Sequence, residues 1–218
     1  MITEEKERVR NLIWSTLENN NLSQHTKSPY GRIPDFSGST EAARMLRSTE
    51  EWQNAEVIFS SPDTAQIKVR EFALLDKKLL IMASPKLKDG FILIDPFSIK
   101  GDEKTASTIK GAFKFGKKIH ELTKLRFVLR NQRFREFPQV DLVVEGSVAV
   151  DKSGNRLGKG GGYGDREISE LISEKAITQS TPVVTTVHEI QIIDKVPTEE
   201  HDQKINMIIT SERVIRII

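Results

Sequence analysis

The sequence predicts a single α/β domain, residues 1–218, with a mostly parallel sheet covered by helices on both faces. Short apolar runs typical of buried strands alternate with segments of helical periodicity. The runs expected to be strands are Val57–Ser60, Leu79–Ala83, Phe91–Ile94, Val140–Val144, Ser147–Val150, Pro182–Val187, Gln191–Ile193 and Ile205–Ile209. Alternation of strands and helices favours a parallel sheet, because each connecting helix packs back onto it.

Composition excludes several classes of protein. Hydrophobic residues make up 37% of the chain and charged residues 29%, as in globular domains. The net charge of +2 is too small to imply a nucleic-acid partner by itself, and no apolar stretch approaches the roughly 20 residues of a membrane span. The absence of cysteine excludes disulfides, cysteine–zinc sites and thiol catalysis. We therefore expect a cytoplasmic protein with no membrane partner, of undetermined oligomeric state.

The first helix is expected from about Thr3 and carries two cations beside its apolar stripe. Lys6 and Arg10 fall on the face that holds Ile13 and Leu17, at about 100° per residue. These cations could point into a cleft at the edge of the core. On the pattern alone, however, a solvated helix face is the favoured interpretation.

A glycine-rich loop follows the predicted strands, and five of the seven residues from Gly158 to Gly164 are glycine. Arg156, Lys159 and Arg166 supply cations, and a helix is expected to begin near Asp165. Glycine lets backbone N–H groups approach an anion closely, and a helix N-terminus favours negative charge. A flexible linker is the alternative, but the interspersed Lys, Tyr, Asp and Arg favour anion binding.

Two familiar phosphate-binding patterns do not fit the chain. The G-x-G-x-x-G pattern fails at the loop, because Tyr163 stands where the third glycine is required. Residues Gly111–Lys118 nearly form a Walker A loop, but Lys118 replaces the Ser or Thr that would hold magnesium. We interpret that second segment as a solvated helix face.

A basic segment, Lys124–Arg135, holds five cations and no acidic residue. With Phe127 and Phe134 nearby, it could bind RNA or a polyanionic cofactor tail. A solvated edge is the favoured interpretation, because the chain as a whole lacks a strongly basic balance. The four histidines are scattered and form no metal-binding pattern.

Three blocks resemble one enzyme family. They are V-D-L-V-V-E-G-S-V-A-V-D (Val140–Asp151), G-N-R-L-G-K-G-G-G-Y-G-D-R (Gly154–Arg166) and V-P-T-E-E-H-D-Q-K-I-N-M-I-I-T (Val196–Thr210). In order and spacing they are similar to the 5-formyltetrahydrofolate cyclo-ligase family, also called methenyltetrahydrofolate synthetases. The resemblance implies a three-layer Rossmann-like fold of the NagB, RpiA and CoA-transferase kind. The block from Phe36 to Pro96 looks more like a divergent, archaeal-type branch.

The resemblance implies an ATP- and magnesium-dependent enzyme. In the family, ATP phosphorylates the formyl oxygen of 5-formyltetrahydrofolate, and ring closure then gives 5,10-methenyltetrahydrofolate. The expected ATP-binding residues are Lys6, Arg10, Arg156, Gly158, Lys159, Gly160, Gly161, Gly162, Tyr163 and Gly164. Lys159, Tyr163 and Arg166 are expected to be catalytic, and Asp165 and Asp202 match positions that bind magnesium. From sequence alone, a helix N-cap is an equally favoured role for Asp165.

Two departures concern the folate side. The family usually has Tyr-Tyr-Asp-Arg, and here Gly164 replaces the second Tyr. The family also has a Glu in an E-x-x-T pattern, whereas residues Ser61–Arg70 offer only Asp63, one carbon shorter. The favoured hypothesis is a 5-formyltetrahydrofolate cyclo-ligase. The alternatives are an ATP-dependent paralogue acting on another small molecule and a non-catalytic nucleotide- or RNA-binding module.

Overall fold

The computed structural model describes residues 1–217 except 100, 125–127, 130–131 and 134–136, and it describes no side chain from 122 to 136. Within the described residues, eight strands form one sheet. In spatial order these are β12 (Val214–Arg216), β11 (Met207–Ile209), β10 (Val183–Thr186), β7 (Leu142–Glu145), β1 (Val57–Ser60), β2 (Leu79–Ala83), β3 (Phe91–Ile94) and β4 (Lys117–Lys118). The strands from β11 to β2 are parallel, and those at both edges are antiparallel. The predicted mostly parallel sheet is confirmed.

Helices and two small hairpins complete the fold. The helices are α1 (Ile2–Asn19), α2 (Ser39–Arg47), α3 (Glu50–Asn54), α4 (Ile67–Leu75), α5 (Glu103–Ala106), α6 (Ile109–Phe115), α7 (Ile119–Lys124) and α8 (Tyr163–Ser173). The hairpins are β5 (Val128–Leu129) with β6 (Gln132–Arg133), and β8 (Ala149–Val150) with β9 (Arg156–Leu157). None of the described helices is long and apolar enough to cross a membrane.

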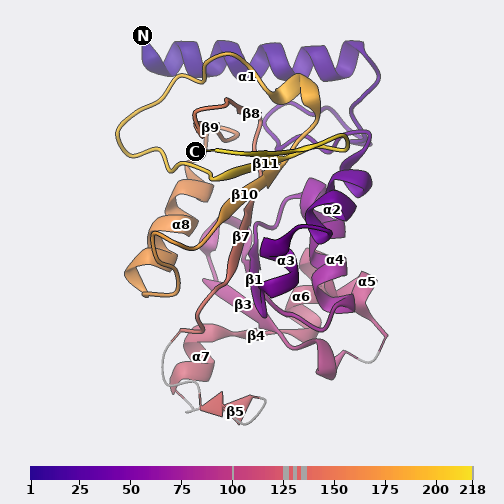
Figure 1. Ribbon diagram of the computed structural model, residues 1–218, viewed down its shortest axis with the longest axis vertical. Coiled ribbons are helices and arrows are strands. Elements are labelled where there is room, and N and C mark those ends of the chain that lie inside the picture. Colours follow the sequence, from indigo (N-terminus) through magenta and orange to yellow (C-terminus); the bar gives the residue numbers. More distant parts are fainter. Residues whose placement is uncertain (100, 125–127, 130–131, 134–136, 218) are drawn as a thin grey trace.

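Two apolar cores cover the two faces of the sheet, because successive strand residues point to opposite faces. One face packs against α2 to α6, through side chains such as Leu46, Trp52 and Leu74. The other packs against α8 through Ile168 and Leu171. Figure 1 shows the resulting three layers, with α2 to α6 on one side of the sheet and α8 on the other. The predicted three-layer arrangement is therefore confirmed.

A third core joins α1 to the β8–β9 hairpin. Ile13, Trp14 and Leu17 of α1 pack there, and Leu157 contributes from β9. In Figure 1, α1 runs across the end of the sheet where β8 and β9 lie. This placement brings the polar border of the α1 stripe, which holds Lys6 and Arg10, to the carboxyl ends of the parallel strands.

The order of the parallel strands reverses between β1 and β7. From β1 the chain passes to β2 on one side, and it later returns to β7 on the other side, where Ser60 is in register with Val144. In open α/β sheets, such a switch point leaves a crevice at the carboxyl ends of the two strands. The segment after β1, which holds Asp63, and the end of β7 at Glu145 border this crevice.

Several local predictions are wrong. Gln191–Ile193 is no strand: residues Glu189–Gln191 form a 3-10 turn whose Ile190 N–H donates to His188 Nδ1 at 3.2 Å. In the segment 147–150, only Ala149 and Val150 are a strand, and they pair in the hairpin rather than the main sheet.

The segment 111–118 is not a solvated helix face. Helix α6 ends at Phe115, β4 follows it, and Gly111 is buried. A Cβ on Gly111 would lie 1.8 Å from the Thr105 carbonyl oxygen, so the close packing of α6 on α5 requires glycine. The side chains of the basic segment 124–135 lie outside the described residues, so its RNA-binding role stays a prediction.

Candidate active site

The glycine loop connects β9 to α8 and presents free backbone donors. Gly160 and Gly162 have φ of +100° and +63°, a left-handed conformation that favours glycine. The backbone N–H groups of residues 159–165 donate to none of the described residues. The last three belong to the first turn of α8, where N–H groups lack partners within the helix and the dipole favours an anion. The loop therefore has the geometry of a phosphate cradle.

Two pockets adjoin this loop and share part of its wall. The first, which we call the helix-side pocket, lies between α1 and the loop and has a volume of about 340 Å³. The second, the sheet-side pocket, lies at the carboxyl ends of β1 and β7 and has a volume of about 240 Å³. The residues common to both are Arg156, Gly158, Gly161, Gly162 and Asp165.

Lys6 and Arg10 line the helix-side pocket, so the structure places them in a cleft rather than on a solvated face. Both side chains are buried. Lys6 Nζ lies 2.6 Å from Asp202 and 2.8 Å from Glu199, and Arg10 Nε donates to the Gly158 carbonyl oxygen at 2.8 Å. Arg10 thus ties α1 to the glycine loop.

Asp165 and Asp202 also line the helix-side pocket. Asp165 accepts hydrogen bonds from Arg156 at 2.6 Å and from the Gln203 N–H at 3.1 Å. Burial opposes ionisation of Asp202, but hydrogen bonds from Lys6 and from the Glu199 N–H hold its pKa below the ordinary value. Both groups therefore offer the hard oxygen ligands that magnesium prefers.

A further possible metal ligand set lies beside Asp202. Glu199, His201 and Asp202 offer ligand atoms within 4.8 Å of one another. The helix-side pocket thus fits magnesium bound to phosphates, since magnesium is usually held by one or two carboxylates together with substrate phosphates.

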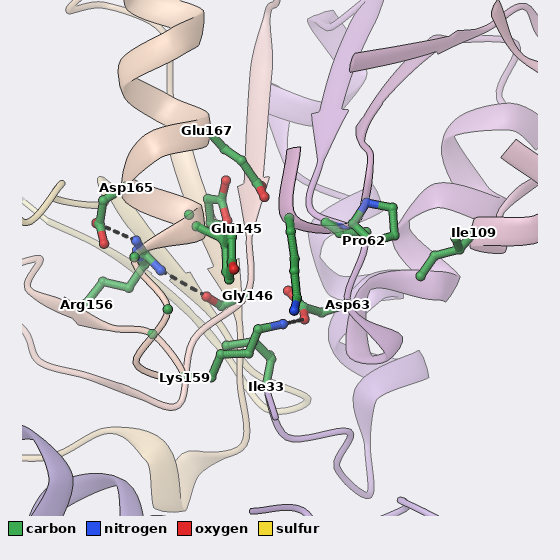
Figure 2. Close-up of a pocket in the computed structure, with 17 residues that line it drawn as sticks. Ile33, Pro62, Asp63, Ile109, Glu145, Gly146, Arg156, Lys159, Asp165 and Glu167 are labelled. Atoms are coloured by element: carbon green, nitrogen blue, oxygen red, sulfur yellow. Dashed lines mark hydrogen bonds and ion pairs between the residues drawn. The ribbon is translucent and has the colours of Figure 1, made fainter. Parts of the chain in front are cut away.

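Figure 2 shows the sheet-side pocket, where Lys159 points toward Asp63. Lys159 Nζ lies 2.7 Å from Asp63 Oδ1. The side chain of Lys159 therefore reaches the sheet-side pocket instead of the helix-side pocket. Asp63 follows β1 and lines the pocket in which the family resemblance implies a carboxylate. The fully buried Arg70 holds this segment, because it donates hydrogen bonds to the carbonyl oxygens of Asp63 and Ser61.

Two glutamates that sequence reasoning missed form an acidic pair in the sheet-side pocket. Glu145 ends β7, Glu167 lies on α8, and their exposed fractions are 2% and 3%. Neither carboxyl group accepts a hydrogen bond from any other described residue, and the two groups hydrogen-bond to each other when one is protonated. Figure 2 shows both side chains between α8 and the end of β7. The signal in the sequence was a glutamate that directly ends an all-apolar strand.

Burial raises the pKa of Glu145 to about 8, partly opposed by Arg156 and reinforced by the charges of Asp63 and Asp165. Burial and the neighbouring Glu145 raise the pKa of Glu167 well above its ordinary value. Two carboxyl groups this close and this buried cannot both ionise easily. The pair therefore holds at least one proton at neutral pH.

Gly164 is required by the packing of Arg156. The Arg156 guanidinium donates to Asp165 and, at 3.2 Å, to the Gly146 carbonyl oxygen. A Cβ on Gly164 would lie 2.9 Å from both terminal nitrogens of Arg156 and 3.0 Å from Glu145 Oε2. The family pattern has a tyrosine at this position, whereas here the Arg156 guanidinium and the Glu145 carboxyl group lie beside Gly164.

Tyr163 and Arg166 pack on each other at the start of α8. The Arg166 guanidinium lies 4.4 Å from the centre of the Tyr163 ring and donates to the Gly161 and Gly162 carbonyl oxygens. Tyr163 lines the sheet-side pocket, whereas Arg166 is exposed and lines neither of the two pockets. The contacts of Arg166 therefore hold the shape of the loop.

Known proteins are similar to this chain in sequence. A methenyltetrahydrofolate synthase domain-containing protein of Bos taurus is 34% identical over 215 residues, which cover 96% of this chain and 53% of that protein. The chain thus spans about half the length of the curated relatives that it matches most fully. A 5-formyltetrahydrofolate cyclo-ligase of Mycolicibacterium smegmatis is 30% identical over 77 residues, 35% of this chain and 37% of that protein.

The fold is similar to the NMR structure of Aquifex aeolicus 5,10-methenyltetrahydrofolate synthetase, with a TM-score of 0.57 and 19% identity over 97% of this chain and 92% of that chain. The model of the 5-formyltetrahydrofolate cyclo-ligase family matches residues 2–211. This match covers α1, the two pockets and the glycine loop. The chain belongs to the 5-formyltetrahydrofolate cyclo-ligase family, as the three sequence blocks predicted.

Proposed function

We propose that this protein, acting as one domain, is an ATP- and magnesium-dependent ligase that converts 5-formyltetrahydrofolate to 5,10-methenyltetrahydrofolate, ADP and phosphate. The observation that carries the proposal is the row of free backbone N–H groups from 159 to 165, between two pockets that share Arg156. Membership of the cyclo-ligase family supports it. A nucleotide would occupy the helix-side pocket and the second substrate the sheet-side pocket.

In the helix-side pocket, the loop amides would bind the ATP phosphates together with the three cations Lys6, Arg10 and Arg156. The glycines of the loop keep Cβ atoms away from the phosphates. Asp165 and Asp202 would hold magnesium, which neutralises charge on the phosphate oxygens when bound. These two carboxylates are held in place by Arg156 and Lys6, respectively.

Lys159 and Tyr163 would act from the sheet-side pocket. In the first step, the formyl oxygen attacks the terminal phosphorus and the bond to the ADP oxygen breaks. In the second, the neighbouring folate nitrogen attacks the formyl carbon and loses its proton, and the carbon–oxygen bond breaks as phosphate leaves. Lys159 would exchange its ion pair with Asp63 for the transferred phosphoryl group, where a cation stabilises developing charge. Arg166 would keep the loop in shape, and its direct catalytic role stays a prediction.

A different small-molecule substrate is the second candidate function. The presence of Arg156 and Glu145 beside Gly164, together with Asp63 in place of a glutamate, favours it. A nucleotide- or RNA-binding module has only the basic segment 124–135 in its favour.

The test is the absorbance of 5,10-methenyltetrahydrofolate after mixing the purified protein with 5-formyltetrahydrofolate, ATP and magnesium. We expect an ATP-dependent rise that Lys159→Ala abolishes. Lys152→Ala, an exposed lysine in the β8–β9 turn, is the matched control and should not change the rate. If no product forms while calorimetry shows ATP binding, the folate assignment is wrong, and a screen for ADP release over other small molecules would identify the acceptor.

A further inference from the structure

The Glu145–Glu167 pair lacks the partners that buried carboxyl groups normally have. Both side chains are more than nine-tenths buried and line the sheet-side pocket, and apart from their contact with each other no described residue donates a hydrogen bond to them; Glu145 Oε1 and Glu167 Oε2 have no partner. Arg156, whose charge acts on Glu145, already donates to Asp165 and Gly146. Leaving a buried acceptor without a donor is destabilising, so a ligand that supplies the donors would recover that free energy.

Two kinds of ligand do not suit this pair. A phosphate or carboxylate would bring further acceptor oxygens, and negative charge, against two acids. A divalent cation needs more ligands that converge, but within the described residues the group of three with metal-binding spacing is Glu199, His201 and Asp202, in the other pocket. The remaining chemistry is a ligand edge rich in N–H donors.

We propose that Glu145 and Glu167 bind the substrate through an edge with adjacent N–H donors, as in a 2-amino-4-oxopyrimidine ring, and so determine which ring the enzyme accepts. A ring of this class places a ring N–H beside an exocyclic amino group, which matches neighbouring carboxyl oxygens. The 2-amino-4-oxopteridine part of a folate has this edge. The inference deepens the proposed function and rests on it for the identity of the substrate.

The walls of the sheet-side pocket suit a flat heterocycle. Ile33, Pro62 and Ile109 line it, so apolar side chains accompany the carboxyl pair, as in pockets that use few polar groups to fix orientation. Figure 2 shows Pro62 and Ile109 on one side and Glu145 and Glu167 toward α8. Because the glycine loop forms the shared wall, the far end of such a ring system would face the phosphates.

The experiment is calorimetric binding of 5-formyltetrahydrofolate in the absence of ATP. The proteins are the wild type, Glu145→Gln, Glu167→Gln and a control, Glu170→Gln, which changes an exposed carboxyl group on the same helix. Gln keeps the shape of Glu but cannot carry its charge or its acidic proton. We expect the two pocket variants to bind about ten- to a hundredfold more weakly, because each replaces one carboxyl group of the hydrogen-bonding pair by a neutral amide. The control and the ATP affinity should change less than twofold.

A second ligand makes the test independent of folding defects. An analogue in which hydrogen replaces the 2-amino group should bind the wild type at least tenfold more weakly than the parent compound, and this discrimination should vanish in Glu145→Gln. Unchanged affinity in both pocket variants, or equal binding of the two ligands by the wild type, would overturn the inference while leaving the proposed function standing.

Failure of the proposed function has a different outcome. If the wild type binds 2-amino-4-oxopteridine but not 5-formyltetrahydrofolate, and the pocket variants lose that binding, then the folate assignment fails and the recognition site stands. If the wild type binds neither compound, the inference is wrong.

Discussion

The two pockets share one wall but leave opposite kinds of hydrogen-bonding group free. In the helix-side pocket the charged side chains are paired with one another, and the free groups are backbone N–H donors of the loop. In the sheet-side pocket, one buried carboxyl oxygen of each glutamate, Glu145 Oε1 and Glu167 Oε2, has no hydrogen-bond partner. Free donors suit an acceptor-rich ligand such as a polyphosphate, and free acceptors suit a donor-rich ring. From this contrast we infer that the two pockets bind different kinds of ligand.

The largest expected effect is on the shared wall. In Gly164→Ala the new Cβ would displace the Arg156 guanidinium, which lies only 2.9 Å from its position. We expect a loss of about 1–3 kcal/mol in the free energy of unfolding, measured in urea, and weaker binding in both pockets. Gly158→Ala is the control for stability, since its Cβ would make an ordinary 3.5 Å contact with Arg156. If both variants were equally stable, the packing of the Arg156 guanidinium would not require glycine at position 164.

The next effect should be confined to the helix-side pocket. Lys6→Met keeps the apolar stem but removes the charge, so we expect ATP affinity to fall about tenfold or more by calorimetry, with folate affinity unchanged. Arg8→Met, two residues along α1 at an exposed position, should bind ATP as the wild type does. Equal losses for both ligands in Lys6→Met would mean that the pockets are not separate binding sites.

The pH dependence of stability should have opposite signs in the two pockets. Glu145 binds its proton more tightly in the folded protein, with a pKa of about 8 against an ordinary 4.5. Its contribution therefore lowers the free energy of unfolding as pH rises from about 4.5 to 8. The pKa of Asp202 is depressed in the folded protein, so its stabilising contribution is present above the unfolded value of about 3.9 and is lost as pH falls through the folded pKa.

Urea unfolding of the wild type and Glu145→Gln from pH 4.5 to 8 tests the first sign. The variant should lose less stability across this window, by on the order of 1 kcal/mol or more. Parallel curves would show that Glu145 titrates at its ordinary value. In Asp202→Asn, only the acid limb below about pH 4 should flatten.

The smallest effect is expected outside both pockets. Arg166→Ala should change ATP affinity less than about threefold, because within the described part of the chain the exposed guanidinium is hydrogen-bonded to loop carbonyl oxygens and stacked on the Tyr163 ring. The comparison is made by measuring the ATP affinities of Arg166→Ala and Lys6→Met side by side by calorimetry. A loss as large as that of Lys6→Met would mean that Arg166 contacts the ATP phosphates directly.

Local sequence patterns predicted the strands and the glycine loop, because these features depend on residues close together in the chain. Apolar runs gave the parallel strands, and glycines among cations gave the loop between β9 and α8. Periodicity gave the side of α1 that holds Lys6 and Arg10, but the favoured solvated face was wrong, because only tertiary packing puts that border over the strand ends. The apolar run 191–193 was mistaken for a strand, since a buried 3-10 turn has the same residue types.

The acidic pair could not be predicted in this way. Glu145 and Glu167 are 22 positions apart, on β7 and α8, and although Glu145 ends an apolar run, nothing in the sequence pairs it with Glu167. They meet because α8 packs on the sheet through Ile168 and Leu171, a contact that no local pattern specifies. Likewise, the sequence indicated Asp63 as a candidate carboxylate but could not predict its ion pair with Lys159, which is 96 positions away.

The ion pair between Lys6 and Asp202 joins residues 196 positions apart. The cation of α1 therefore meets its carboxylate partner only when two segments far apart in the chain have come together. Closing so long a loop has an entropic cost that a ligand holding both ends would offset. A ligand that contacted both walls of the helix-side pocket would therefore tie together two segments far apart in the chain and raise the free energy of unfolding.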